Sequence, residues 1–342
     1  MMSKYLSYKI SFFNFMLSVL IVVLHSNCKI TLGWSNDGTI LSDFIEVLSL
    51  YISCIGHIAV PMFYIISAYL FYYNISTMKS VLFKIKKRVN SLLLPYLLWN
   101  ALFVLIFWSI LHSPIASYLH MTNNLSSISD VLMSIINSDL TPLWFVKNLL
   151  IFVALSPIIW LIARKNLSVI ILVILLSGIV VVVYEISYFN FLYWIPSYFI
   201  GILFTKSSVS HFFTTESSSC KFTMLYLIFF LLLIIFTVHS GHMYLYRIIA
   251  PMLIWKLSDY ILKKYHFVPK YYWSYSFFIY CTHFFVINVI QKLLYLVLGN
   301  SNFAYITIYA VTPFLVIPLC IFMANIVNKK VPKGYKILTG NR

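Results

Sequence analysis

Long apolar stretches separated by short polar connections recur along almost the whole chain. Most of them approach or exceed the roughly 20 apolar residues that an α-helix needs to cross a bilayer. We therefore predict an all-α integral membrane protein, a bundle of about ten transmembrane helices with both termini on the same side. The predicted spans are residues 10–30, 46–73, 92–112, 142–163, 168–185, 191–205, 221–239, 245–262, 272–298 and 305–328.

Two connections are longer than the others. Residues 113–141 lie on the side opposite the termini, and their short apolar pieces among Asn, Ser and Asp predict a partly ordered lid or re-entrant element. Residues 206–220 lie on the same side as the termini, and their many serines predict a solvated linker.

The basic residues indicate which side of the membrane is cytoplasmic. In this segmentation they gather at the surface that carries both termini, in the groups Lys4 and Lys9, Lys79 to Arg88, Arg164 and Lys165, Lys206 and Lys221, Lys256 to Lys270, and Lys329 to Arg342. The exceptions, near the opposite surface or inside spans, are Lys29, Lys147, Arg247 and Lys292. By the positive-inside rule, both termini are cytoplasmic.

Composition changes this picture little. The 342 residues are 62% hydrophobic and 9% charged, with no stretch long and polar enough for a soluble domain, so we predict one transmembrane domain over 1–342. The net charge of +16 is mainly a topology signal, and we expect no nucleic-acid partner, because no basic block has the aromatic interleaving that such binding uses. The five cysteines are scattered without metal-ligand spacing, so we expect no metal site.

His25 closes the first apolar stretch. An ionisable residue inside a bilayer is costly and marks a functional site by default. Asn14 lies eleven residues earlier, so on an α-helix the two side chains share nearly one face, separated by about 16 Å along the axis. The structural alternative is a histidine that only bonds a neighbouring helix.

Four other segments carry candidate chemistry. The basic cluster Lys84, Lys86, Lys87 and Arg88 suits phosphate binding, although composition alone favours a positive-inside anchor. Within the second span, Pro61 frees a backbone carbonyl, and the small pair Ser67-Ala68 permits close approach of a helix or ligand. The remaining candidates are polar or aromatic residues of three spans, namely His57, Trp144 and His283.

Five motifs occur in one order: Asn14-x10-His25, VPMFYIISAYL at 60–70, KKRVNSLLLPYLLW at 86–99, LWFVKNLLIF at 143–152 and SYSFFIYCTH at 274–283. In order and approximate spacing they resemble the membrane acyltransferase-3 family, over nearly the whole chain. The chain departs from the common family pattern at Asn14 and His57, where Arg is frequent, and at Ala68, where Gly is usual.

The resemblance implies a multi-pass protein of the bacterial cytoplasmic membrane. It would move an acyl group, often acetyl, from cytoplasmic acyl-CoA to a hydroxyl of a cell-surface glycan or its lipid-linked precursor. On that basis His25 is the expected catalytic base. The residues expected to bind acetyl-CoA are Asn14, Lys84, Lys86, Lys87 and Arg88. Those expected to contact the acceptor substrate or the oxyanion are His57, Ser67, Trp144 and His283.

Two other function classes stay open at this point. A polysaccharide polymerase or a lipid-linked-sugar transporter would also be basic inside, aromatic-rich and about ten spans long. Polymerases of that kind usually carry large external loops, however, and no internal repeat of the transporter type is evident. A binding or sensory membrane protein is a third option, which no specific feature favours.

Overall fold

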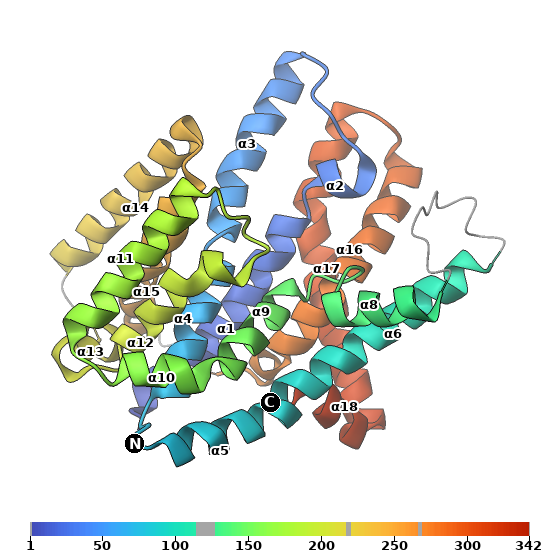
Figure 1. Cartoon of the computed structure of the whole chain (residues 1–342). Coiled ribbons are helices and arrows are strands. Elements are labelled where there is room, and N and C mark those ends of the chain that lie inside the picture. Colours follow the sequence, from blue (N-terminus) through green and yellow to red (C-terminus); the bar gives the residue numbers. More distant parts are fainter. Residues whose placement is uncertain (1, 114–126, 217–219, 266–268, 342) are drawn as a thin grey trace.

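Helices make up the regular structure of the described residues, 2–113, 127–216, 220–265 and 269–341, in the computed structural model (Figure 1). The all-α prediction is therefore confirmed. In chain order the elements are α1 (Lys4–His25), α2 (Cys28–Leu32), α3 (Ile40–Gly56), α4 (Ala59–Tyr72), α5 (Met78–Arg88), η1 (Val89–Leu93), α6 (Leu94–Leu111), α8 (Ile128–Asn137), α9 (Trp144–Ala154), α10 (Ser156–Ala163), α11 (Leu167–Val183), η2 (Phe191–Trp194), α12 (Ile195–Leu203), α13 (Ser207–Thr214), α14 (Cys220–Ser240), α15 (Met243–Tyr265), η3 (Tyr271–Tyr275), α16 (Ser276–Leu298), α17 (Asn302–Lys330) and α18 (Pro332–Thr339).

Six helical stretches in this part of the chain are long and apolar enough to span a membrane on their own. They are Lys4–His25, Ile40–Tyr72, Met78–Leu111, Cys220–Ser240, Tyr271–Leu298 and Asn302–Lys330. The pair α9 and α10 passes the same test jointly but is bent by 64° at its junction. The other predicted spans form shorter helices, α11 and η2 with α12, or the helix α15, which carries charged side chains. The count of ten spans thus stays a prediction.

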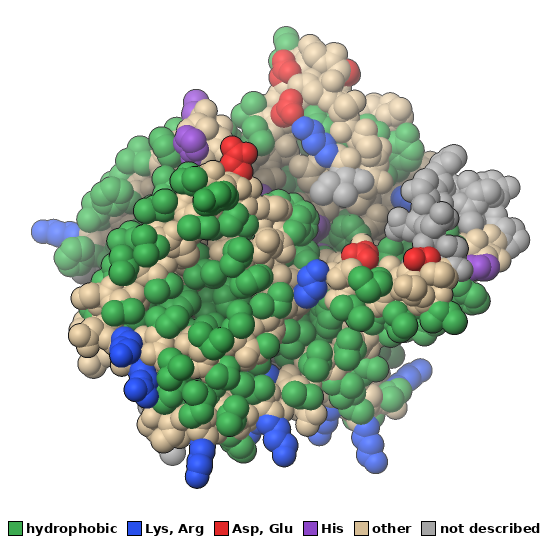
Figure 2. All heavy atoms as spheres, in the orientation of Figure 1, with side chains coloured by type: hydrophobic (Ala, Val, Ile, Leu, Met, Phe, Trp, Pro, Cys, Tyr) green, Lys and Arg blue, Asp and Glu red, His purple; other side chains and the backbone are tan. Residues whose placement is uncertain are grey.

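Charge is distributed unevenly over the molecule. In Figure 2 most of the visible Lys and Arg side chains gather at one end, and the acidic side chains lie away from it. Both chain termini lie towards the basic end in the same orientation (Figure 1). This arrangement fits the predicted sidedness, which rests on the same charges.

The helix α1 lies inside the bundle, in contact with α3, α4, α16 and α17. Next to it, α4 packs closely on α12, because Gly201 has no side chain. A Cβ at Gly201 would overlap the backbone carbonyl of Ile65 and lie 2.8 Å from the Ala68 Cβ. The predicted close approach at Ser67-Ala68 is therefore confirmed for Ala68, and a helix makes it.

Residues 217–219 of the inner connection lie outside the described residues, and its segment 207–214 is not a solvated linker. Ser207–Thr214 form α13, and the Phe213 ring is buried in a stack on Trp255, with ring centroids 4.2 Å apart. The Trp255 indole N–H also donates to the Phe213 carbonyl at 3.1 Å. The prediction failed because two phenylalanines among the serines supply an apolar face that packs against α15.

The outer connection is only partly within the described residues, since 114–126 lie outside them. Residues 128–137 form α8, whose first turn is closed by a capping box between Ser127 and Asp130. The Tyr96 hydroxyl of α6 donates to the Ile136 carbonyl at 2.6 Å and ties α8 to α6. This part of the connection is therefore an ordered helix, and the lid or re-entrant element stays a prediction.

Candidate active site

A cavity of about 400 Å³ lies between α1, α4, α9 and α16. This volume is within the range of small-molecule pockets, roughly 300–1,000 Å³. Of its lining residues, Ser11 and Ser274 are exposed and Tyr280 is buried. The full lining is Ser11, Asn14, Ser18, Phe63, Ile66, Ser67, Leu70, Arg88, Leu92, Phe145, Val146, Leu149, Trp273, Ser274, Ser276, Phe277 and Tyr280.

Three residues predicted from the sequence meet in this cavity: Asn14 of α1, Ser67 of α4 and Arg88 of α5. Within the described residues none of these three side chains has a hydrogen-bond partner, so their donors and acceptors are available to a ligand. Aliphatic and aromatic side chains supply most of the remaining wall. An apolar cavity with a few polar groups is the usual form of a small-molecule site.

The four residues of the predicted basic cluster, Lys84, Lys86, Lys87 and Arg88, lie in different environments. The Lys84 ammonium donates to the carbonyls of Phe71 at 2.6 Å and Tyr73 at 2.8 Å, so it caps the C-terminal end of α4. Lys86 and Lys87 are exposed to solvent, and only Arg88 reaches the cavity. Lys84 therefore already has hydrogen-bond partners, whereas the described residues provide none for the Arg88 side chain.

A π-helical turn, η1, follows Arg88 directly and joins α5 to α6. The residue that caps α6, Leu93, is itself helical, so the chain offers no separate helix N-terminus at Pro95. Widened turns of this kind often occur at functional sites.

His25 and His283 form a hydrogen-bonded pair outside the cavity lining. His283 Nε2 lies 3.2 Å from His25 Nδ1, and His283 is three residues after Tyr280 on α16. His283 Nδ1 lies 2.7 Å from the Tyr280 carbonyl, and His25 Nδ1 lies 3.0 Å from the Ile21 carbonyl. Carbonyl oxygens only accept, so in both neutral rings the proton is on Nδ1.

The tautomers assign opposite roles to the two rings. The N–H at His25 Nδ1 donates a hydrogen bond to His283 Nε2, and His25 Nε2 keeps a free lone pair. The His25 side chain is half-buried, and within the described residues its Nε2 has no hydrogen-bond partner. The pair thus leaves one basic nitrogen accessible.

His57 lies at the junction of α3 and α4, where the helix is interrupted. Arg247 of α15 donates to His57 Nδ1 at 3.2 Å and to the Tyr193 hydroxyl at 3.0 Å. Because Arg247 can only donate, the proton of neutral His57 is on Nε2. Gly56 and Leu24, the residues before His57 and His25, pack against each other, since a Cβ at Gly56 would lie 2.7 Å from the Leu24 Cβ. The two histidine sites are therefore neighbours.

Trp144 does not line the cavity. Its ring belongs to an aromatic cluster with Tyr188, Phe189 and Trp194, with centroid separations of 5.8, 5.4 and 6.1 Å. One turn later on α9, the Lys147 ammonium donates to the Asn137 carbonyl at the end of α8, at 3.0 Å. Lys147 thus extends to a helix terminus rather than into a polar cavity.

Comparison with known proteins fits this arrangement. A family model described as an acyltransferase domain matches residues 10–324. The chain belongs to the acyltransferase-3 family. Neither the curated proteins nor the solved structures contain a significant match. The resemblance found from the motifs is therefore confirmed, and the protein is a membrane acyltransferase whose matched region includes the cavity and both histidine sites.

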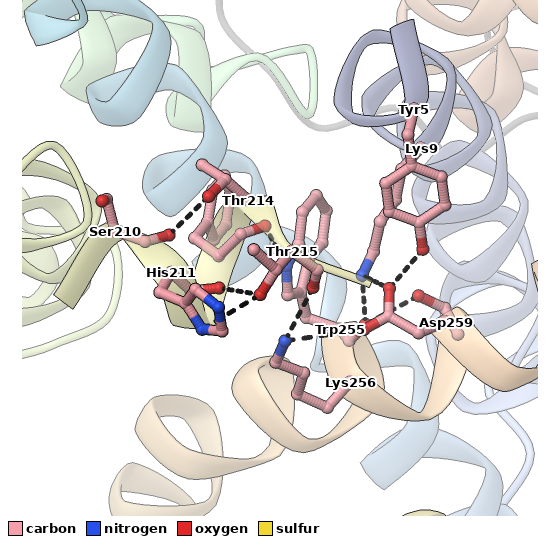
Figure 3. Close-up of polar contacts among 11 residues, drawn as sticks. Tyr5, Lys9, Ser210, His211, Thr214, Thr215, Trp255, Lys256 and Asp259 are labelled. Atoms are coloured by element: carbon pink, nitrogen blue, oxygen red, sulfur yellow. Dashed lines mark hydrogen bonds and ion pairs between the residues drawn. The ribbon is translucent and has the colours of Figure 1, made fainter. Parts of the chain in front are cut away.

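This acyltransferase-3 member also contains a buried ion cluster that sequence reasoning missed (Figure 3). Lys9 of α1, predicted among the cytoplasmic surface cations, is instead fully buried and paired with Asp259 of α15. The Tyr5 hydroxyl donates to the same carboxylate, and the Lys256 ammonium lies 3.6 Å from it. A lone acidic residue inside the predicted span 245–262 is the sequence signal that marks this cluster.

The cluster holds α1 against α15. The Lys9 ammonium also donates to the Trp255 carbonyl at 2.7 Å and lies 4.0 Å from the centre of that ring. Lys9 and Asn14 are five residues apart, so they point about 140° apart around the helix. Pairing on the back of α1 therefore turns Asn14 towards the cavity.

Proposed function

We propose that this protein is an O-acyltransferase that moves an acetyl group from cytoplasmic acetyl-CoA to a hydroxyl of a cell-surface glycan or its lipid-linked precursor. It would act in the bacterial cytoplasmic membrane, with ten spans and cytoplasmic termini. The observation that carries the proposal is a cavity in which the side chains of Asn14, Ser67 and Arg88 have no hydrogen-bond partner among the described residues. The carbonyl of its lining residue Tyr280 accepts from His283, whose partner His25 keeps one free basic nitrogen.

The cavity suits the extended arm of a coenzyme A thioester. Arg88 is the cation of the basic segment that reaches the cavity, and a guanidinium binds phosphate through parallel charge-assisted hydrogen bonds. Asn14 and Ser67 offer free donors and acceptors for the amides of the arm. Asn14 and His25 are about 16 Å apart along α1, so one extended ligand can pass both.

His25 supplies the base in this mechanism. Its free Nε2 takes the proton of the acceptor hydroxyl as the hydroxyl oxygen attacks the thioester carbonyl carbon. When the tetrahedral intermediate collapses, the carbon–sulfur bond breaks and the imidazolium returns the proton to the leaving thiolate. His283 Nε2 accepts from His25 Nδ1 throughout, which orients the ring and stabilises its charged form.

His57 supplies a donor for the developing oxyanion. Arg247 donates to His57 Nδ1, so the N–H at Nε2 is free to donate. The nearby positive charge of Arg247 strengthens that N–H as a donor. Donors of this kind, aimed at the oxyanion, typically contribute about 10²- to 10³-fold to the rate.

The proposal is tested with the protein in lipid nanodiscs, which expose both membrane faces. The assay measures transfer of radiolabelled acetyl from acetyl-CoA to the envelope glycan of the source organism, first freed of its esters by mild alkali. His25→Ala should lower the rate by about 10²- to 10⁴-fold. The matched control is His239→Ala, because exposed His239 bonds the carbonyl four residues earlier as His25 does. Equal rates for His25→Ala and wild type would refute the proposed role of His25, and absence of any transfer by the wild type would refute the function.

A further inference from the structure

We propose that Arg247 binds an anionic group of the acceptor, so that the acyltransferase acts on an acceptor that carries a carboxylate or a phosphate. This inference rests on the proposed function and names the chemical class of its acceptor. The anionic group is a carboxylate of an acidic sugar or a phosphate that links the glycan to its lipid.

The first observation is an uncompensated buried charge. Arg247 is 8% exposed, and none of the three ion pairs within the described residues includes it. A cation held in a low-dielectric bundle without a carboxylate partner is costly, and such residues usually mark substrate or ion sites. The missing counter-ion is therefore expected from a ligand.

The second observation concerns donors. A guanidinium carries five N–H donors in a planar fork. Arg247 uses one on the Tyr193 hydroxyl and one on His57 Nδ1, and no other acceptor contacts it within the described residues. The remaining donors suit a carboxylate or a phosphate, which a guanidinium can bind through two parallel hydrogen bonds.

The third observation is an aromatic surface beside the cation. The Arg247 guanidinium lies 5.1 Å from the centre of the Tyr188 ring and 5.6 Å from that of Tyr193. Tyr188 and Phe189 are 39% and 53% exposed, and both pack on Trp144. Exposed aromatic faces stack against the C–H face of a sugar ring, which gives the acceptor a platform next to the cation.

The position of Arg247 also fits the chemistry. It donates to His57, and the residues that precede His57 and His25, Gly56 and Leu24, pack against each other. An acidic sugar bound at Arg247 would therefore present a hydroxyl towards the His25 base. Arg247 lies near the first turn of α15, whereas Lys263 and Lys264 lie in its last turn. In the predicted topology this places Arg247 in the outer half of the membrane, where a surface glycan arrives.

The experiment compares three forms of the de-esterified envelope glycan in the nanodisc assay. One form is untreated, the second has its carboxyl groups reduced to alcohols, and the third is released from lipid phosphate by mild acid. For the wild type, removal of the bound anionic group should lower kcat/KM by about 10- to 100-fold, the usual contribution of a hydrogen bond to a charged group. Loss on carboxyl reduction assigns a carboxylate, and loss on acid release assigns a phosphate.

Arg247→Gln should remove this discrimination, so that the variant uses the untreated and treated glycans equally, with an unchanged KM for acetyl-CoA. Arg247→Lys keeps the positive charge but not the planar set of N–H donors, so it should retain part of the discrimination between untreated and treated glycans. If Arg247→Gln does not fold, the reduced discrimination between glycans expected of Arg247→Lys tests the inference instead. Lys29→Gln is the matched control, because it removes an exposed cation of the same predicted side. Its discrimination should equal that of the wild type.

Two results would overturn the inference while leaving the transferase function intact. One is equal use of all three glycans by the active wild type. The other is an Arg247→Gln variant that is slower on all three glycans by the same factor, which would make Arg247 a positioning residue for His57 only.

Discussion

His283 is predicted to act through His25, and replacement by leucine tests this directly. Leucine has a similar volume but no acceptor for the N–H at His25 Nδ1, and this nitrogen lies 3.2 Å from Nε2 of His283 in the wild type. The Ile21 carbonyl, 3.0 Å from the same nitrogen, remains as a second acceptor. His283→Leu thus removes one of the two acceptors at His25 Nδ1 and leaves the other.

The size of the effect follows from the charge on His25 in the transition state. A hydrogen bond to a charged group contributes about 1.5–3 kcal/mol, and the remaining carbonyl keeps the loss near the lower value. That corresponds to about a tenfold lower kcat. His25→Ala removes the base itself and should cost about 10²- to 10⁴-fold. His283→Gln offers an oxygen acceptor and should stay close to wild type.

The assay is acetyl transfer in nanodiscs, with kcat and the KM for acetyl-CoA measured separately. KM should not change, because His283 does not line the cavity. Thermal unfolding of each variant in detergent serves as the folding control. A His283→Leu variant with wild-type kcat would mean that the pair is only structural. A variant as inactive as His25→Ala would mean that His283 is itself a base.

Three further predictions concern the cavity and the ion cluster. Arg88→Gln should raise the KM for acetyl-CoA at least about tenfold, because a charge-assisted contact is lost. Lys86→Gln should leave that KM unchanged, because Lys86 is exposed outside the cavity. Equal KM values for the two variants would contradict the assignment of Arg88 to the acetyl-CoA site. Asp259→Asn leaves buried Lys9 without its counter-ion and should destabilise the protein by about 3–5 kcal/mol in thermal unfolding. Adding Lys9→Met should restore most of that loss, and no recovery would argue against the pair. Asn14→Cys, in a chain otherwise free of cysteine, should react with a water-soluble thiol reagent, and acetyl-CoA should slow the reaction; a rate insensitive to acetyl-CoA would place the donor elsewhere.

Several features of the site could be predicted from sequence because they depend on one helix. Asn14 and His25 share a face of α1 by helical geometry alone. Likewise, Ser67 and Ala68 were recognisable as a position of close approach, although the sequence does not show that Ala68 meets a helix while Ser67 meets the cavity. The roles of Lys84 and Arg88 were not separable, since which cation reaches the cavity depends on how α5 packs.

The sequence by itself determined the helices, their membrane character, the segregation of charge and the family. Apolar length and backbone hydrogen bonding within each helix are local properties, because a bilayer leaves the backbone no other partner. Only the tertiary structure decided which polar residues meet. Lys9 and Asp259 are 250 residues apart, His25 and His283 are 258, and His57 and Arg247 are 190. Lipid tails are as apolar as leucine, so the hydrophobic pattern does not select neighbours among helices. Close packing and a few buried polar contacts make that selection.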